Sequence, residues 1–283
     1  MSPQADAWQE WLGRSERRVD RVCAAPLAAL AATLDRDDPE PLPGSEVPPL
    51  WHWLYFTPLV RQSELGPDGH ARRGGFLPPV PLPHRMWAGG RLAFEQPLRV
   101  GDEIVRTSRI VDIRAKEGRS GPLVFVTVRH EVARAGGIAI TEEHDIVYRG
   151  DPRPDAAQPT PQPAPANERF AREIAPDPVL LFRYSALTFN GHRIHYDRRY
   201  VTDVECYPGL VVHGPLIATL LLDLLRREYP RARVRRFTFK AVSPLFDTDR
   251  FVVCGRPDGE NAFKLWARNH EGVVAMQASA EID

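Results

Sequence analysis

The sequence predicts an α+β fold in which an antiparallel β-sheet wraps one helix, and it predicts this unit twice. The strand-like segments come in runs instead of alternating with helices, which argues against a parallel sheet. A proline- and alanine-rich stretch at residues 150–167 divides the chain of 283 residues into halves of similar length. The two halves also share a local pattern, which indicates a distant internal repeat.

The shared pattern is a phenylalanine and an aspartate eight residues apart, with a proline between them. It occurs as Phe94 and Asp102 in the first half and as Phe239 and Asp247 in the second, and each aspartate precedes a β-rich run. Period-two alternation within these runs indicates half-buried antiparallel strands. The predicted strands are 103–113, 122–134 and 137–149 in the first half, and 250–257, 262–269 and 273–282 in the second.

One helix is predicted in each half. In the second half, Pro215 suits a first helical position because it has no N–H group that would stay unpaired. Leucines then recur at helical spacing up to a stop at Pro230, so most of this helix should be buried. The first half offers a shorter apolar helix over residues 24–34. The expected organisation is a domain over 1–150, an extended linker over 151–167 and a domain over 168–283.

The composition excludes several classes of protein. Lys plus Arg and Asp plus Glu number 37 each, so the chain lacks the basic surplus that is typical of nucleic-acid binding. The three cysteines are widely spaced and form no CxxC pair, which argues against a disulfide framework or a structural zinc site. No signal peptide and no run of ~18 apolar residues is evident, so the sequence predicts a soluble, cytoplasmic protein without a membrane span.

The residues best suited to catalysis lie within 182–216. Asn190, His192 and His195 share a short turn-rich stretch, and His213 and Gly214 then open the apolar helix. The N-terminus of a helix presents backbone N–H groups that can stabilise a developing oxyanion. A histidine beside it can carry a proton, because its ordinary pKa lies near 6.5. This combination predicts an enzyme that adds or removes water.

The motif FNGHRIHYD at 189–197, followed by PGLVVHGPL at 208–216, resembles the MaoC-like hot-dog hydratases. It is most similar to their double-hot-dog branch: the hydroxyacyl-thioester dehydratases type 2 and the mesaconyl-C4-CoA and itaconyl-CoA hydratases. The segments 11–20, 48–56 and 74–94 resemble the first hot dog of that branch. The resemblance implies two curved antiparallel sheets, each wrapping a central helix, with a degenerate substrate-binding first half and a catalytic second half.

The resemblance also assigns catalytic residues. His195 matches the histidine of the family pattern D-x-N-P-x-H, and Gly214 matches its oxyanion-binding glycine. Asn190 stands where the family has the aspartate, so the chain offers one proton carrier fewer, since an amide can only hold water or a carbonyl by hydrogen bonds. The implied reaction is the reversible hydration of an α,β-unsaturated acyl thioester. His195 would take a proton from water and deliver one to the α-carbon.

Four further residues are candidates for substrate binding: His213, Arg85, His84 and Trp87. Arg85 can pair with a carboxylate through two hydrogen bonds, which would suit mesaconyl-C4-CoA or itaconyl-CoA as substrate. His213 has a second interpretation as a structural histidine that closes the turn. His195 likewise has one, as a buried, hydrogen-bonded histidine.

Other functions remain open at the level of sequence. His192 and His195 have the spacing of a metal pair, but no third ligand is evident, so no metal and no cofactor are expected. The partner is expected to be an acyl-CoA or acyl-carrier thioester, and the chain can be a monomer or a homodimer. The alternatives are a 3-hydroxyacyl-ACP/CoA dehydratase of fatty-acid synthesis, a hot-dog thioesterase and a non-catalytic acyl-CoA-binding protein.

Overall fold

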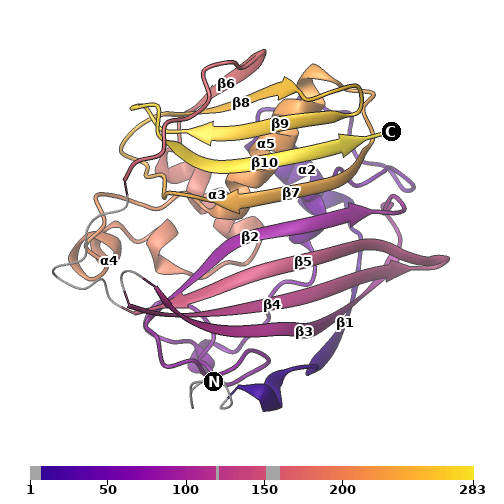
Figure 1. Ribbon diagram of the computed structural model, residues 1–283. Helices are drawn as coiled ribbons and strands as arrows, with labels where there is room; N and C mark the ends of the chain where they lie inside the picture. Colours follow the sequence, from indigo (N-terminus) through magenta and orange to yellow (C-terminus); the bar gives the residue numbers. More distant parts are fainter. Residues whose placement is uncertain (1–7, 119–120, 151–159) are drawn as a thin grey trace.

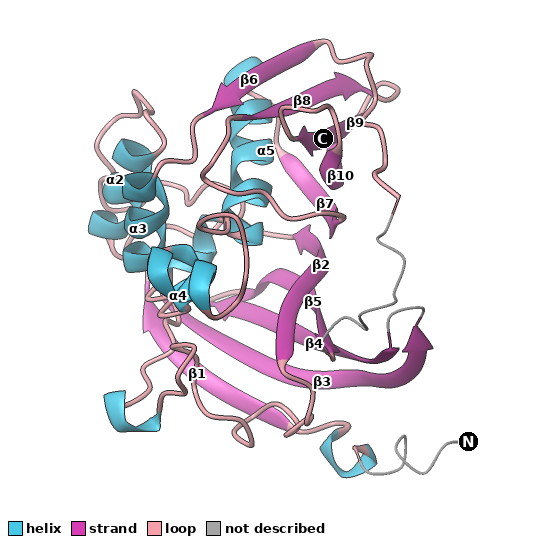
Figure 2. Ribbon diagram, turned by 90° about the vertical axis from the view of Figure 1, so that its left-hand side faces the viewer, coloured by secondary structure: helices cyan, strands magenta, loops and turns pink. Residues whose placement is uncertain are grey.

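The computed structural model describes residues 8–118, 121–150 and 160–283. They form one large antiparallel sheet, and the helices gather on one of its faces (Figures 1 and 2). The strands follow the order β1-β3-β4-β5-β2-β7-β10-β9-β8-β6. Strands β1 to β5 come from the first half and β6 to β10 from the second.

The elements of the first half are β1 (Ser15–Arg21), α2 (Ala24–Thr33), β2 (His84–Phe94), β3 (Glu103–Gly118), β4 (Gly121–Arg134) and β5 (Gly137–Arg149). Those of the second half are β6 (Phe170–Ile174), α3 (Pro178–Leu187), α4 (Arg198–Asp203), α5 (Gly214–Glu228), β7 (Val234–Ala241), β8 (Phe251–Pro257), β9 (Ala262–Arg268) and β10 (Val274–Ile282). Four short 3-10 turns are η1 (Gln9–Trp11), η2 (Trp51–Leu54), η3 (Gln62–Glu64) and η4 (Arg193–His195). The six strand predictions and both helix predictions are confirmed to within a few residues.

The expectation of two separate sheets is wrong, because β2 and β7 join the two halves into one continuous sheet. These strands pair antiparallel from Gly89 opposite Lys240 to Ala93 opposite Arg236. A side chain at Gly89 would not fit, since a Cβ atom there would lie 2.5 Å from the carbonyl oxygen of Phe239. The absence of a side chain at this position therefore permits the junction.

The two predicted helices pack differently. Helix α5 lies against β8, β9 and β10, and every residue from Leu216 to Leu225 is buried, so the second half does wrap a central helix. Helix α2 instead packs against α3 and η2, which corrects the expectation of a matching helix in the first half. Its ten residues are mostly alanine, and only Leu27 and Leu30 supply large buried side chains.

A single hydrophobic core crosses the junction. It contains leucines of α2 and α5 together with Leu92 of β2 and Phe237 and Phe239 of β7. The hydrophobic packing therefore continues across the predicted domain boundary. Of the predicted linker, residues 151–159 lie outside the described residues, and Ala164 N–H donates to the Gly272 carbonyl oxygen at 2.8 Å.

None of the described helices has the length and apolar character needed to cross a membrane.

Candidate active site

Three histidines of the second half, His192, His195 and His213, lie on short turns between α3 and α5. Asp177 caps the N-terminus of helix α3: its carboxylate accepts hydrogen bonds from the N–H groups of Val179 and Leu180. Just after α3, Phe189 adopts a φ of 50°, which reverses the chain toward Asn190. We call residues 190–195 the histidine segment. It runs through η4 and lies beside the start of α5, as the backbone bond from Val211 N–H to the Ile194 carbonyl oxygen shows.

His195 is almost enclosed, with 8% of its surface exposed. Its Nδ1–H donates to the carbonyl oxygen of Val211 at 2.7 Å, which leaves Nε2 with the lone pair. Among the described residues, Nε2 has no hydrogen-bond partner. Burial lowers the pKa of His195 to about 4, although the bond to Val211 opposes the shift, so the imidazole is neutral at pH 7. A neutral imidazole in this tautomer can act as a base.

The ring of His213 stacks on the ring of His195, with 3.7 Å between centroids and 17° between planes. His213 is 1% exposed, and its Nε2 is 2.8 Å from Ser185 Oγ. Its Nδ1 is buried with no hydrogen-bond partner in the described part of the chain. Burial holds the pKa of His213 well below its usual value. The His213 ring thus covers one face of the His195 ring.

Asn190 and Gly214, the other two predicted catalytic residues, both keep N–H groups without a partner in the described chain. The side-chain oxygen of Asn190 accepts the backbone N–H of His192 at 3.1 Å, and its amide NH₂ has no partner among the residues described. Helix α5 begins at Gly214, and no hydrogen bond of the described chain uses the Gly214 N–H. A Cβ atom at Gly214 would meet nothing within 4 Å, so this helix start faces open space. The geometry suits an oxyanion site.

A cleft of about 1010 Å³ lies between the halves. Inward-facing side chains of β1 to β5 form its floor, and the region from Phe182 to Tyr196 with Pro215 forms its opposite wall. Asn190 lines the cleft, whereas His195, His213 and Gly214 are not among its lining residues. A site built from both halves explains why the first-half sheet carries polar side chains on its inner face.

The structure separates the first-half candidates. Arg85 and Trp87 line the cleft, but His84 does not. Its Nδ1 instead lies 3.7 Å from a carboxylate oxygen of Glu205. Trp87 packs against His144 with 3.9 Å between ring centroids and 32° between ring planes. Burial raises the pKa of Tyr148 on the floor, and the charge and hydrogen bond of Arg85 act against that shift. Arg85 is therefore a cationic side chain on the cleft floor, next to Tyr148.

Sequence reasoning missed two residues of the first half that reach the histidine segment. Residues 66–70 form a tight turn, the docking loop, and Asp68 accepts the backbone N–H of Arg193 at 2.9 Å through its carbonyl oxygen. His70 packs against His192 with 4.0 Å between ring centroids. No local pattern marks these residues, since their partners lie more than 120 positions away in sequence.

Asp68, His70 and His192 also bear on the expectation that no metal is bound. One atom from each lies within 4.8 Å of the others, so this group could hold a metal ion. Two of its three members come from the other half, and His195, the other histidine of the pair considered from sequence, is not among them. Carboxylate and imidazole ligands suit zinc-class ions at bonds of about 2.0–2.2 Å, so the three side chains would have to move closer together.

A buried polar cluster lies on the cleft floor of the first half. Glu142 is 4% exposed and accepts hydrogen bonds from His52 and Trp53, each at 3.1 Å. Burial alone would raise the pKa of Glu142, but the bond and charge of His52 outweigh burial and hold it at about 2. Burial lowers the pKa of His130 to about 4 and that of His144 to about 3. No sequence pattern singled out Glu142, His130 or His144.

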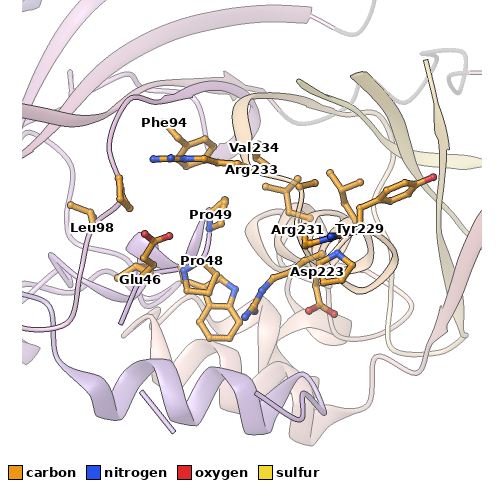
Figure 3. A pocket seen from close by; sticks show the side chains of 18 of the residues that line it. Glu46, Pro48, Pro49, Phe94, Leu98, Asp223, Tyr229, Arg231, Arg233 and Val234 are labelled. Carbon is orange, nitrogen blue, oxygen red and sulfur yellow. The ribbon is translucent and has the colours of Figure 1, made fainter. Parts of the chain in front are cut away.

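A second, smaller cavity of about 430 Å³ lies at the opposite end of α5 (Figure 3). Tyr229 and Arg231 line one side and Glu46 and Leu98 the other, with Arg233 and Phe94 between them. None of the predicted site residues lines it. The chemistry expected from the sequence therefore belongs to the larger cleft.

Comparison with known proteins supports the resemblance. Residues 50–247 match the family "Hydroxyacyl-thioester dehydratase type 2". The chain is 48% identical over 278 residues to a mesaconyl-C(4)-CoA hydratase of Chloroflexus aurantiacus, with 97% of this chain and 98% of the relative covered. It is 29% identical to the mitochondrial hydroxyacyl-thioester dehydratase type 2 of Schizosaccharomyces pombe, covering 73% of this chain and 76% of the relative.

Solved structures agree at the level of the fold. A Mycobacterium tuberculosis protein described as having a double hotdog fold aligns with a TM-score of 0.59 and 14% identity, covering 96% of each chain. The hot-dog prediction is thus confirmed, with the single continuous sheet as its correction. The family match spans most of the chain and includes the histidine segment and the start of α5. This protein is therefore a member of the hydroxyacyl-thioester dehydratase type 2 family.

Proposed function

We propose that the protein catalyses the reversible hydration of an α,β-unsaturated acyl thioester, as a mesaconyl-C4-CoA/itaconyl-CoA-type hydratase. Its family and its relatives are named hydratases and dehydratases, so it is an enzyme of this hydro-lyase class. The observation that carries the mechanism is the free Nε2 of His195 beside the unpaired amide at the start of α5.

The proposed mechanism begins with the thioester carbonyl. The Gly214 N–H at the helix start stabilises the enolate-like oxygen, which makes the β-carbon electrophilic. Neutral His195 takes a proton from water as the oxygen attacks that carbon, and the side-chain amide of Asn190 orients the water. His213 and the Val211 carbonyl hold the His195 ring in place.

The proposed substrate is a dicarboxylic acyl-CoA. Arg85 lies on the cleft floor, where its guanidinium can pair with the free carboxylate of mesaconyl-C4- or itaconyl-CoA. Trp87 and His144, whose rings pack at 32° to each other, line the same cleft. The relative that is 48% identical acts, by its name, on mesaconyl-C(4)-CoA, which supports this choice.

We also propose that the first half binds substrate and that the second half carries His195 and Gly214, without a cofactor. The enzyme acts in the cytoplasm on an acyl-CoA or acyl-carrier thioester, as a monomer or a homodimer.

The experiment is a panel of enoyl-CoA thioesters monitored at the absorbance of the conjugated double bond. We expect the band to bleach fastest with mesaconyl-C4-CoA or itaconyl-CoA. Preference for long-chain enoyl substrates would favour a dehydratase of fatty-acid synthesis instead. Release of free thiol would indicate a thioesterase, and binding without either change would indicate an acyl-CoA-binding protein.

A further inference from the structure

The docking loop brings a second imidazole into the catalytic cleft. Its backbone bonds directly to the histidine segment: besides the bond between Asp68 and Arg193, the Arg193 guanidinium donates to the Pro67 carbonyl oxygen at 2.9 Å. Gly69 meets Gly191 so closely that a Cβ atom at Gly69 would lie 1.9 Å from the Gly191 carbonyl oxygen. The loop is thus a fixed part of the site wall.

His70 is held in one orientation by Asp68. Its Nδ1 is 2.9 Å from Asp68 Oδ2, and its backbone N–H donates to Asp68 Oδ1 at 3.0 Å. An ionised carboxylate can only accept, so Nδ1 carries the hydrogen and Nε2 keeps its lone pair. Nε2 of His70 has no hydrogen-bond partner in the part of the chain that the structure describes. A carboxylate-oriented imidazole is the arrangement of a general acid–base group.

His70 lines the cleft together with Asn190 and Pro215, and its side chain is 26% exposed. His195 is not among the lining residues, but the ring of His192 packs near both, with centroid distances of 4.0 Å to His70 and 5.4 Å to His195. Hydration needs proton transfers at two neighbouring places, the attacking water and the α-carbon. His70 offers a second imidazole, on the cleft surface itself, for one of these transfers.

We propose that His70, oriented by Asp68, is a second catalytic residue, which carries the proton to and from the α-carbon of the acyl thioester. It supplies the proton carrier that Asn190, in place of the family aspartate, does not provide. This inference rests on the proposed hydratase function. It assigns to the first half a direct part in the chemistry.

In hydration, a water O–H bond breaks and its proton goes to His195. The water oxygen bonds to the β-carbon while the π electrons of the double bond move into the enolate. The enolate α-carbon then takes a proton from His70, which draws it from solvent, and His195 returns its own proton to solvent. In the dehydration direction, neutral His70 removes the α-proton.

The test separates the two proton transfers. A saturated acyl-CoA without a hydroxyl group, such as butyryl- or succinyl-CoA, is incubated with enzyme in D₂O, and deuterium at the α-carbon is measured by mass spectrometry. We expect His70→Asn to slow this exchange about 10²–10⁴-fold, the usual effect of removing an acid–base group. His195→Asn should lose hydration by a similar factor and keep α-exchange within about threefold of the wild-type rate.

Two further variants complete the design. Asp68→Asn keeps the imidazole but weakens its orientation, so α-exchange should fall by an intermediate factor even if His70→Asn proves unstable. His270→Asn removes an exposed imidazole outside the cleft and should leave both reactions unchanged. Normal α-exchange in folded His70→Asn or in Asp68→Asn, alongside wild-type hydration, would overturn only this inference. A wild-type enzyme that hydrates none of the enoyl thioesters would instead overturn the proposed function.

Discussion

At the scale of single residues, the site depends on imidazoles that stay neutral because they are buried. His195 stacks on a second buried histidine and keeps one nitrogen available, which is the state that a base requires. Asn190 contributes an amide and no charge, so proton transfer has to be carried by histidines. The cost of this design is sensitivity to acid, because a buried neutral histidine binds its proton more readily once the chain unfolds.

The acid sensitivity can be measured as stability against pH. Burial lowers the folded-state pKa of His195 and His130 to about 4 and that of His144 to about 3, against about 6.5 when unfolded. The unfolded chain thus binds more protons below pH 6.5, and the free energy of unfolding should fall as pH drops through that value. We expect a lower Tm at pH 5.5 than at 7.5 by calorimetry. The acids contribute little in this window, since their unfolded pKa values lie near 4. An equal or higher Tm at pH 5.5 would contradict the burial argument.

Arg85 should set the preference for a charged acyl group. Arg85→Ala should raise KM for mesaconyl-C4-CoA about 10–100-fold, as expected for the loss of a charged hydrogen bond worth about 1.5–3 kcal/mol. The KM for crotonyl-CoA, which has no second carboxylate, should hardly change. Arg85→Lys is the matched control, because it keeps the charge and loses the two-pronged geometry. Equal effects on both substrates would remove Arg85 from carboxylate recognition.

At the scale of elements, the docking loop and the histidine segment act as one unit although they come from different halves. Gly69 has a φ of 87°, which favours glycine, and it also touches Gly191. A side chain would therefore displace the loop as well as strain the backbone.

Gly69→Ala should lower the hydration rate by about 10²-fold, the effect expected when a site is shifted by about 1 Å. Gly272→Ala is the control, because Gly272 has a φ of 79° with nothing within 4 Å of an added Cβ. It carries similar backbone strain without the contact. The comparison uses initial rates on one enoyl-CoA, with thermal unfolding of both variants measured in parallel. Equal losses in the two variants would show that backbone strain alone is responsible.

The sequence predicts elements whose signals are local. The leucines after Pro215 predict α5 because their spacing matches a helix. The strands are predicted by the alternation of apolar and polar residues. Helix α3 was missed although Asp177 and Pro178 are a readable start signal. The docking loop could not be predicted, because its role depends on tertiary contact with residues far along the chain. The pairing of β2 with β7 could not be predicted either, because these two strands are far apart in sequence.

At the scale of the whole molecule, the halves are held together by charge as well as by the common core. Asp223 on α5 has a side chain 1% exposed and contacts three arginines: Arg36 at 2.6 Å, Arg172 at 3.0 Å and Arg227 at 2.8 Å. Arg36 belongs to the first half and the other two to the second. The buried carboxylate therefore ties the central helix to the segment that follows α2.

Asp223→Asn should destabilise the protein by up to about 3–5 kcal/mol, the range for breaking a buried ion pair. It removes the buried carboxylate that three partly buried arginines share, and among the described residues only Arg36 keeps another carboxylate, that of Asp38. At this chain length the expected fall in Tm is roughly 2–4 °C per kcal/mol. Asp203→Asn is the control, since its exposed pair with Arg199 should contribute little. Calorimetry on both variants decides the matter. A Tm for Asp223→Asn within a degree or so of the control would show that the arginine cluster does not stabilise the fold.

The cleft has walls of different origin within one polypeptide, and this has a consequence for how its specificity can change. In a symmetric pair of identical chains, any substitution appears twice, so a residue that improves one wall also alters its mirror image elsewhere. Here the floor around Arg85 and the wall around His195 vary independently. New acyl groups can be accommodated by redesigning β2 and β5 while the proton-transfer machinery is left untouched.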